Sequence, residues 1–110
     1  MQISREDKNG ISIFRMVGDI DINTSPEVKK SFDKAVGKET NKVVINMKNV
    51  SYIDSSGLAT LVEVLKKLRL HGGKLKLTNL SAKVMGLFEI TKLDKLFDIS
   101  NQEEDAVDSF

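Results

Sequence analysis

The middle of the chain contains a β-branched run that is followed, after a short polar segment, by a long helical pattern. The run Val43-Val44-Ile45, inside the segment Lys42 to Met47, is consistent with a strand covered on both faces. Further along, apolar residues recur at steps of three and four: Leu58, Leu61, Val62, Leu65 and Leu68. Gly72-Gly73 stands where such a helix would stop. We therefore expect a central strand that leads through a corner into an amphipathic helix.

The amino-terminal segment predicts a β-hairpin. Ile11 to Val17 alternates apolar and polar residues for most of its length, which is the pattern of a strand with one buried face. Asn9-Gly10 precedes it, and both residue types tolerate the positive φ of a tight hairpin turn. Gln2 to Glu6 would form the preceding edge strand.

A first helix is expected to begin near Thr24 or Ser25. Either residue can cap a helix, Pro26 suits the first turn, and Glu27 can close a capping box. Gly37 is placed to end this helix. The apolar residues share one face at helical spacing: Val28, Phe32, Ala35 and Val36.

The carboxyl-terminal part continues the alternation of strands and helices. Lys74 to Thr78 reads as a strand, and Ser81 is a candidate cap for a third helix with Val84, Leu87 and Phe88 on one face. Ser100 to Glu103 repeats the capping-box pattern before a short last helix with an apolar stripe of Ala106, Val107 and Phe110. We expect one α/β domain over residues 1–110, with a mixed sheet of four to five strands packed against about four helices.

Composition narrows the classes of function. The chain of 110 residues is 40% hydrophobic and 30% charged, as in an ordinary globular domain, and it has no cysteine for disulfide, thiolate or cysteine-metal chemistry. A formal net charge of +1 provides no overall field toward nucleic acid or anionic lipid, and Lys66, Lys67, Lys74 and Lys76 are interpreted as a solvated face. No apolar run is long enough for a membrane span or a secretion signal, so we expect a cytoplasmic protein that binds another protein or a small molecule.

The segment Val50 to Leu58 joins the expected central strand to the long helix and is the most informative part of the chain. Backbone N–H groups at a helix amino terminus lack intrahelical partners, and the helix dipole is positive there. A phosphate on Ser55 would add about −1.5 to −2 charges and would be tolerated at such a position, so a binding partner rather than the fold would feel it. From spacing alone, the favoured interpretation is that Asp54, Ser55 and Ser56 are only helix caps.

An acidic rim would form around this corner if the loop Gly18-Asp19-Ile20-Asp21 packs beside it. Asp19 and Asp21 would then add to Asp54. Like charges that face each other across an interface can cost several kcal/mol, so a rim with an added phosphate could switch off binding to a partner with acidic groups.

Taken together, these segments resemble the signature of bacterial anti-sigma factor antagonists of the STAS-domain family. The resemblance rests on Lys42 to Met47 followed by Val50 to Ala59, and on Gly18 to Asp21, which is similar to the family's Gly-Asp/Glu-hydrophobic-Asp loop. It spans nearly the whole chain, because the remaining segments also fall in the family's order: Gly72-Gly73, Leu75-Lys76-Leu77 and Leu87 to Leu93. The most specific piece is Asp54-Ser55-Ser56-Gly57 after a strand.

The resemblance implies a partner switch rather than an enzyme. It implies that an ATP-using anti-sigma factor kinase phosphorylates Ser55, that a serine phosphatase reverses this, and that only the unphosphorylated form binds the anti-sigma factor and frees a sigma factor. The expected partner-binding residues are Asp19, Asp21, Asp54, Ser56 and Gly57, with no catalytic residue, metal or cofactor. Two adjacent hydroxyls leave open whether Ser56 is modified as well.

Other functions fit the residues less well. A serine hydrolase needs a base beside its nucleophile, but a helix from Ser55 to His71 would separate the only histidine from that serine by roughly 24 Å. Gly72-Gly73 is not followed by the Lys-Ser/Thr of a nucleotide-binding loop. The main rival is a STAS module that serves as a regulatory or structural subunit of a transporter or lipid-transport complex.

Overall fold

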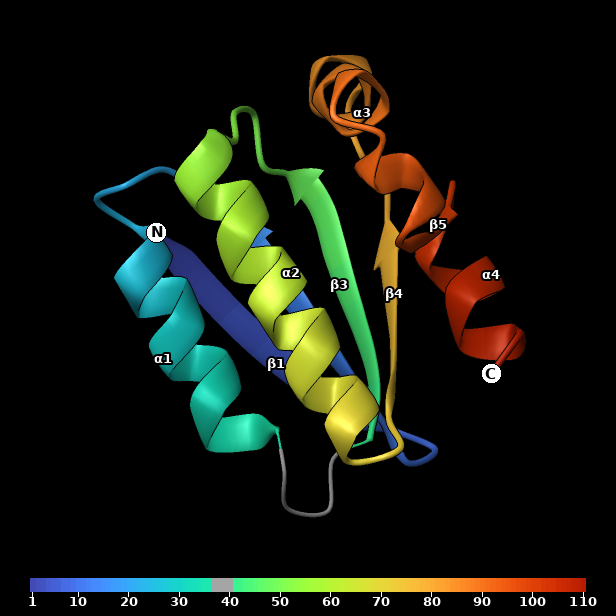
Figure 1. Ribbon diagram of the computed structural model, residues 1–110. Coiled ribbons are helices and arrows are strands. Elements are labelled where there is room, and N and C mark those ends of the chain that lie inside the picture. The colour runs from blue at the N-terminus through green and yellow to red at the C-terminus, as the bar shows by residue number, and fades with distance from the viewer. Residues whose placement is uncertain (37–40) are drawn as a thin grey trace.

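Five strands form one mixed sheet in the order β1-β2-β3-β4-β5 (Figure 1). The computed structural model describes residues 1–36 and 41–110. The strands are β1 (Gln2–Lys8), β2 (Ile11–Val17), β3 (Lys42–Asn49), β4 (Lys74–Thr78) and β5 (Asp98–Ser100). β1 runs antiparallel to β2, whereas the pairs from β2 to β5 are parallel. This mixed topology confirms the α/β prediction.

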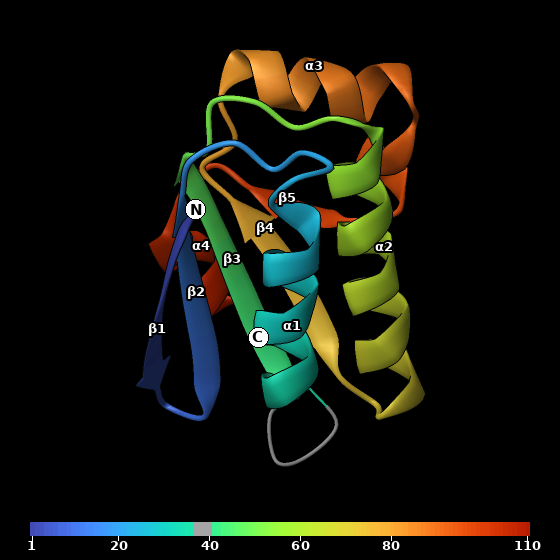
Figure 2. The same cartoon turned by 90° about the vertical axis from the view of Figure 1, so that its left-hand side faces the viewer.

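Helices cover both faces of this sheet, but unequally. They are α1 (Ser25–Ala35), α2 (Ser55–Leu70), α3 (Ala82–Ile90), the 3₁₀ turn η1 (Leu93–Lys95) and α4 (Glu103–Asp108). α1 and α2 lie side by side on one face, here called the front face, and α4 lies on the opposite or back face, while α3 crosses one end of the sheet (Figures 1 and 2). In the described part of the chain, no helix has the length and apolar character that crossing a bilayer requires.

The predicted hairpin and central strand are confirmed. Asn9 and Gly10, with φ of 54° and 77°, connect β1 to β2. β3 is the middle strand, and its β-branched run is buried on both faces, because Val43 and Ile45 join the front core whereas Val44 joins the back cluster. A run that is apolar at consecutive positions is thus explained by helices on both sides.

The front core is built from the apolar faces of α1 and α2 against the sheet. Phe14 on β2 and Phe32 on α1 place their ring centroids 4.5 Å apart, and Phe88 on α3 meets Phe97 edge-on at 5.6 Å. The predicted apolar positions of the first three helices contribute side chains that are at least half-buried, including Val28, Phe32, Leu61, Leu65, Leu68, Val84 and Phe88. Gly37, predicted to end the first helix, lies outside the described residues.

The structure corrects the prediction for β2, which is not buried on one face only. Phe14 and Met16 point into the front core, whereas Ile11 and Ile13 pack into the back cluster beneath α4. The alternation of apolar and polar residues in β2 suggested one exposed face, but the polar residue Ser12 is itself buried and its hydroxyl donates to Asp7 Oδ1 (3.0 Å).

The carboxyl-terminal helix also differs from its prediction. α4 begins at Glu103 after Gln102, so Ser100 does not cap it, and the Glu103 carboxylate instead accepts hydrogen bonds from Arg15 Nε (2.9 Å) and Asn46 Nδ2 (3.0 Å). The predicted apolar stripe is confirmed, since Ala106 is buried and Val107 and Phe110 pack beside it. The preceding strand β5 was not located from the sequence, because it is only three residues long.

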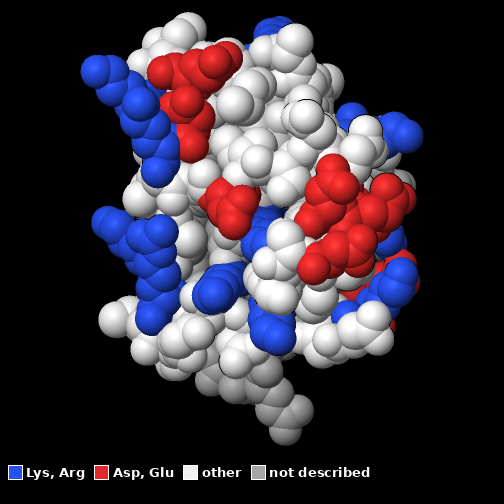
Figure 3. Space-filling model, turned by 90° about the vertical axis from the view of Figure 1, so that its right-hand side faces the viewer, with Lys and Arg blue, Asp and Glu red and all other residues white. Residues whose placement is uncertain are grey.

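The interpretation of Lys76 as part of a solvated face is wrong. Its side chain is buried on the back face, where Nζ donates to the Ala106 carbonyl oxygen (3.4 Å) and to Ser109 Oγ and lies 4.4 Å from the centre of the Phe110 ring. Lys66 and Lys74 are exposed as expected. Figure 3 shows acidic and basic side chains intermixed on the side of the molecule that carries β5 and α4.

Candidate functional site

The corner between β3 and α2 lies at the carboxyl edge of the parallel strands. β3 ends at Asn49 and α2 begins at Ser55, so a short loop carries the chain from the sheet to the helix. In α/β sheets this edge is where ligands and partners commonly bind, because loops and helix amino termini converge there. Figures 1 and 2 show the loop before α1 running beside this one toward the first turn of α2.

Asp54 is the N-cap of α2 and also ties the two loops together. Its Oδ1 accepts a hydrogen bond from the Gly57 N–H (3.0 Å), which is the usual capping bond. Its Oδ2 accepts from the backbone N–H of Ile22 in the neighbouring loop (3.1 Å). Both carboxylate oxygens are therefore engaged in holding the corner, and the helix-cap interpretation is confirmed for this residue.

The loop Gly18 to Asp21 docks on the corner through its backbone. Ile20 N donates to the Tyr52 carbonyl oxygen (2.9 Å) and Asp54 N donates to the Ile20 carbonyl oxygen (3.1 Å), which gives a short parallel bridge between Ile20 and Ile53. The Gly18–Asp21 loop thus packs beside the corner, which was the condition for an acidic rim there.

Residue 57 must be a glycine because the Gly18–Asp21 loop packs very close to it. A Cβ added to Gly57 would lie 2.6 Å from the Ile20 carbonyl oxygen and 2.6 Å from Ile53 Cγ1. Real Cβ atoms do not approach backbone that closely, so any side chain here must push the Gly18–Asp21 loop away from α2. Gly57 is buried, and its part in the site is to let the two loops meet.

Asp19 and Asp21 lie in this docked loop, but they are held differently. Asp19 Oδ1 accepts a hydrogen bond from Ser51 Oγ (2.8 Å), and its side chain is exposed. Asp21 Oδ1 accepts from the backbone N–H groups of Asn23 (2.9 Å) and Thr24 (3.1 Å), so it shapes the turn before α1. Asp19 is the more available of the two to a partner.

The start of α1 is organised by this turn rather than by the predicted cap. Thr24 occupies the N-cap position, but its side chain makes no capping bond. Thr24 Oγ1 instead donates to the Asp19 carbonyl oxygen (2.7 Å) and accepts from the Asp21 N–H (2.9 Å).

Ser55 is the first residue of α2 and is exposed, whereas Ser56 is half-buried. A phosphate on Ser55 would therefore reach solvent and any docked partner, and the positive end of the α2 dipole would stabilise its charge. The half-buried position of Ser56 makes its hydroxyl the less accessible of the two. The geometry suits a reversible charge change at the surface.

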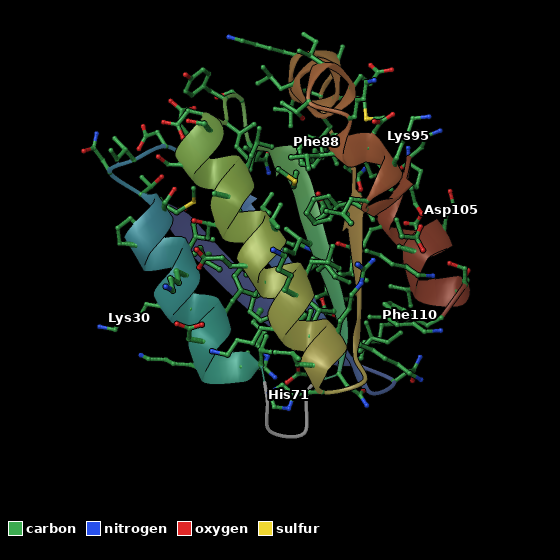
Figure 4. The ribbon with its side chains drawn as sticks, in the orientation of Figure 1. Lys30, His71, Phe88, Lys95, Asp105 and Phe110 are labelled. Atoms are coloured by element: carbon green, nitrogen blue, oxygen red, sulfur yellow. The ribbon has the colours of Figure 1, made fainter. Side chains whose placement is uncertain are left out.

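The only histidine of the sequence, His71, lies far from Ser55. Figure 4 shows His71 at the far end of α2 from the corner, in agreement with the helix bounds Ser55–Leu70. Among residues 1–36 and 41–110, no cluster of three or more histidine, cysteine, aspartate or glutamate side chains could hold a metal ion.

Two exposed apolar side chains at the site were not singled out from the sequence. Ile22 is 70% exposed in the loop before α1, and Tyr52 is 41% exposed in the loop before α2. Each is an apolar residue in a loop and does not fit the apolar pattern of a neighbouring strand or helix. This mismatch was the sequence signal that could have indicated an exposed apolar side chain.

Comparisons with known proteins agree on one family. A family model for the STAS domain matches residues 2–106. The anti-sigma-B factor antagonist of Listeria monocytogenes is 38% identical over 103 residues, which cover 94% of this chain and 90% of that protein. The anti-sigma-B factor antagonist of Bacillus subtilis is 34% identical over 103 residues, covering 94% and 93%. The crystal structure of an anti-sigma factor antagonist from Mycobacterium paratuberculosis matches with a TM-score of 0.89 at 25% identity, covering 98% of this chain and 92% of that one.

Proposed function

The chain belongs to the STAS domain family, and we propose that it acts as an anti-sigma factor antagonist controlled by phosphorylation of Ser55. In the unphosphorylated form it binds an anti-sigma factor kinase, and the sigma factor is released. In the phosphorylated form it does not bind, until a serine phosphatase removes the phosphate. The proposed role is that of a regulatory binding protein in the cytoplasm, not of an enzyme.

The main support for this proposal is that Ser55 is exposed at the start of α2, next to the Asp54 carboxylate, whose two oxygens already accept hydrogen bonds. Asp54 is occupied by the Gly57 and Ile22 N–H groups, so it leaves Ser55 projecting from a corner that is braced on two sides. A phosphate there changes the surface charge without removing any hydrogen bond that holds the corner. Binding can be switched while the fold is retained.

The identity of the relatives supports this role over that of a transporter subunit. The two relatives at 34% and 38% identity are both named anti-sigma-B factor antagonists, and each is matched over about nine tenths of its length. The proposed partners are accordingly the kinase and the phosphatase. Neither nucleic acid nor membrane contact is part of the proposal, which agrees with a net charge of +1.

The first experiment is mass spectrometry after incubation with ATP and an ATP-binding anti-sigma factor from the same genome. A single phosphate on Ser55, located by fragmentation, is expected. Ser55→Ala should block the modification while keeping the affinity for the kinase, and Ser55→Asp should bind weakly because it places charge at the interface. Ser56→Ala is the matched control and should still accept one phosphate. A phosphate on Ser56 alone, or tight binding by Ser55→Asp, would contradict the proposed switch.

The corner itself can be tested at Gly57. Gly57→Val should lower the free energy of unfolding by roughly 2 kcal/mol or more and weaken kinase binding, because its side chain meets the Ile20 carbonyl oxygen and Ile53. Gly86→Ala in α3 is the matched control, since an added Cβ there meets nothing within 4 Å and should be neutral or stabilising. Unchanged unfolding and unchanged affinity in Gly57→Val would show that the close packing does not matter.

A further inference from the structure

We propose that Ile22 and Tyr52 are the apolar anchors by which the anti-sigma factor recognises the unphosphorylated corner, with Lys83 positioning the Tyr52 ring. The inference rests on the proposed function and adds the source of affinity and a second physical basis for the switch. The expected partner surface has an apolar recess for each anchor. It also has an acidic group that faces the Lys83 ammonium.

The first observation is where exposed apolar side chains occur. The large hydrophobic residues that are exposed in the described part of the chain are Val17, Ile22, Tyr52, Leu70, Ile90 and Leu96. Ile22 lies in the loop before α1 and Tyr52 in the loop before α2, and these loops are joined by the Ile20–Ile53 bridge and by the hydrogen bond from Ile22 N to Asp54 Oδ2 (3.1 Å). Figure 2 shows the two loops running side by side toward the start of α2. Exposed apolar side chains that gather around one polar site, rather than standing alone, mark an interaction surface.

The second observation is that both anchors are held in place by the backbone of the corner. The Ile22 N–H donates to Asp54 Oδ2 (3.1 Å), and the Tyr52 carbonyl oxygen accepts from Ile20 N (2.9 Å). A loop whose backbone is already held in place loses less conformational entropy when a partner covers it. These two residues can therefore contribute more to affinity than residues of the same size on a loop whose backbone is not held.

The third observation is that α3, for which the sequence indicated no role in the site, contributes a lysine to it. Lys83, in the first turn of α3, places its Nζ 5.5 Å from the centre of the Tyr52 ring. A cation at this distance is attracted to the ring face and restricts where the ring can lie. The same ammonium offers a positive charge next to an aromatic surface, whereas Asp19 and Asp21 supply negative charge on the other loop.

The arrangement of anchors suggests why a phosphate at Ser55 is effective. Ser55 follows Tyr52 by three residues and comes directly after Asp54, whose carboxylate accepts from the Ile22 N–H. We therefore expect a partner that covers Ile22 and Tyr52 to cover the Ser55 hydroxyl as well. A hydroxyl can be covered at small cost, but a phosphate with about −1.5 to −2 charges would have to be desolvated within an apolar contact. The switch then operates even if the partner carries no acidic group opposite Ser55.

The test compares four chains by isothermal titration against the same anti-sigma factor kinase: wild type, Ile22→Ala, Tyr52→Ala and Ile90→Ala. Ile90 is the matched control because it is 80% exposed, lies at the opposite end of α3 from Lys83, and loses the same atoms as Ile22. We expect affinity to fall on the order of tenfold for Ile22→Ala and somewhat more for Tyr52→Ala, with less than a twofold change for Ile90→Ala. Thermal unfolding of Ile22→Ala should match that of wild type.

The outcomes separate this inference from the proposed function. If wild type binds the kinase and is phosphorylated but Ile22→Ala and Tyr52→Ala bind as tightly as wild type, the anchors are wrong and the proposed function stands. If wild type neither binds nor is phosphorylated, both fail. If Tyr52→Ala unfolds at a lower temperature, Lys83→Met provides the second measurement, because it frees the ring without removing it and should weaken binding about two- to fivefold. An unchanged affinity in Lys83→Met would remove its positioning role.

Discussion

The front face of the sheet is closed by two long helices through apolar contacts, whereas the back face is closed by the six-residue α4 through a small apolar cluster and charged side chains. On the front, α1 and α2 bury Phe32, Leu61 and Leu68 almost completely. On the back, the buried cluster consists of Ile11, Ile13, Val44 and Ala106, and the ends of α4 are held by Arg15 and Lys76.

This difference shows two ways to cover a sheet. Burial of apolar area stabilises by about 25 cal/mol per Å², so two long helices can hold the front face without polar contacts. A six-residue helix buries too little area for that and is too short to be stable alone. We therefore expect the charged contacts at its two ends to help hold α4 on the back face.

The largest effect should come from the front core. Leu61→Ala should lower the free energy of unfolding by about 2–5 kcal/mol, because Leu61 is fully buried between α2 and the sheet and its truncation leaves a cavity. Leu70→Ala is the matched control, since Leu70 is 84% exposed on the same helix and should change stability by less than about 0.5 kcal/mol. Urea unfolding measures both. Equal effects would mean that α2 is not held by its buried face.

The next effect should come from the buried lysine on the back face. Lys76→Met keeps most of the apolar stem but removes the ammonium that donates to Ala106 and Ser109, and should destabilise by about 1–3 kcal/mol. Lys66→Met, on the exposed side of α2, should be close to neutral. Hydrogen exchange should show faster opening of α4 amides in Lys76→Met than of α2 amides. A neutral or stabilising Lys76→Met would show that the back face is held by apolar contact alone.

A smaller and pH-dependent effect should come from Glu103. Hydrogen bonds from Arg15, whose guanidinium meets both carboxylate oxygens (2.9 and 2.8 Å), lower the pKa of Glu103, with a further bond from Asn46. A lowered folded-state pKa stabilises the protein above the unfolded pKa of about 4.3, and this stabilisation is lost as pH falls through the folded value. Glu103→Gln should therefore cost roughly 1–2 kcal/mol at pH 7, and the difference from wild type should shrink below about pH 4. A difference that persists unchanged at low pH would exclude the charge as its cause.

The smallest effect should come from the exposed ion pair on the front, where Lys67 Nζ lies 2.9 Å from Asp33 Oδ1 between α2 and α1. Both side chains are about 40% exposed, so Lys67→Met should change stability by roughly 0–1 kcal/mol, and added salt should reduce the difference. A larger loss of stability in Lys67→Met than in Glu103→Gln would mean that charged contacts matter more on the front face than on the back face. Thermal unfolding at low and high salt measures it.

Much of the fold could be predicted because local patterns and the tertiary structure agree. Asn9-Gly10 adopts the positive φ of the expected turn, and Ser81 Oγ accepts from the Val84 N–H (3.2 Å) as a predicted cap. These features depend on residues that are near one another in the sequence. The capping box predicted at Ser100 did not form, because the Glu103 carboxylate binds Arg15, which lies 88 positions earlier in the sequence. The local pattern had predicted that this carboxylate would accept from a nearby backbone N–H.

The candidate site likewise has features that follow from local sequence and features that do not. The Asp54 cap and the position of Ser55 at a helix start follow from local sequence, whereas the resemblance to the family, and not the spacing, pointed to Ser55 as the modified residue. The exposure of Ile22 and the burial of Lys76 could not be predicted, because each depends on which distant segment covers the side chain.

The sequence by itself determined the order of the helices and of the first four strands, the α/β class and the corner at Asp54-Ser55-Ser56-Gly57, since periodicity, caps and turns act over a few residues. Only the tertiary structure decided that the Gly18–Asp21 loop closes on Gly57 and that both faces of β2 are buried. It also brought Arg15 and Lys76 to the two ends of α4. The physical reason is that burial and long-range hydrogen bonds depend on which segments meet in space.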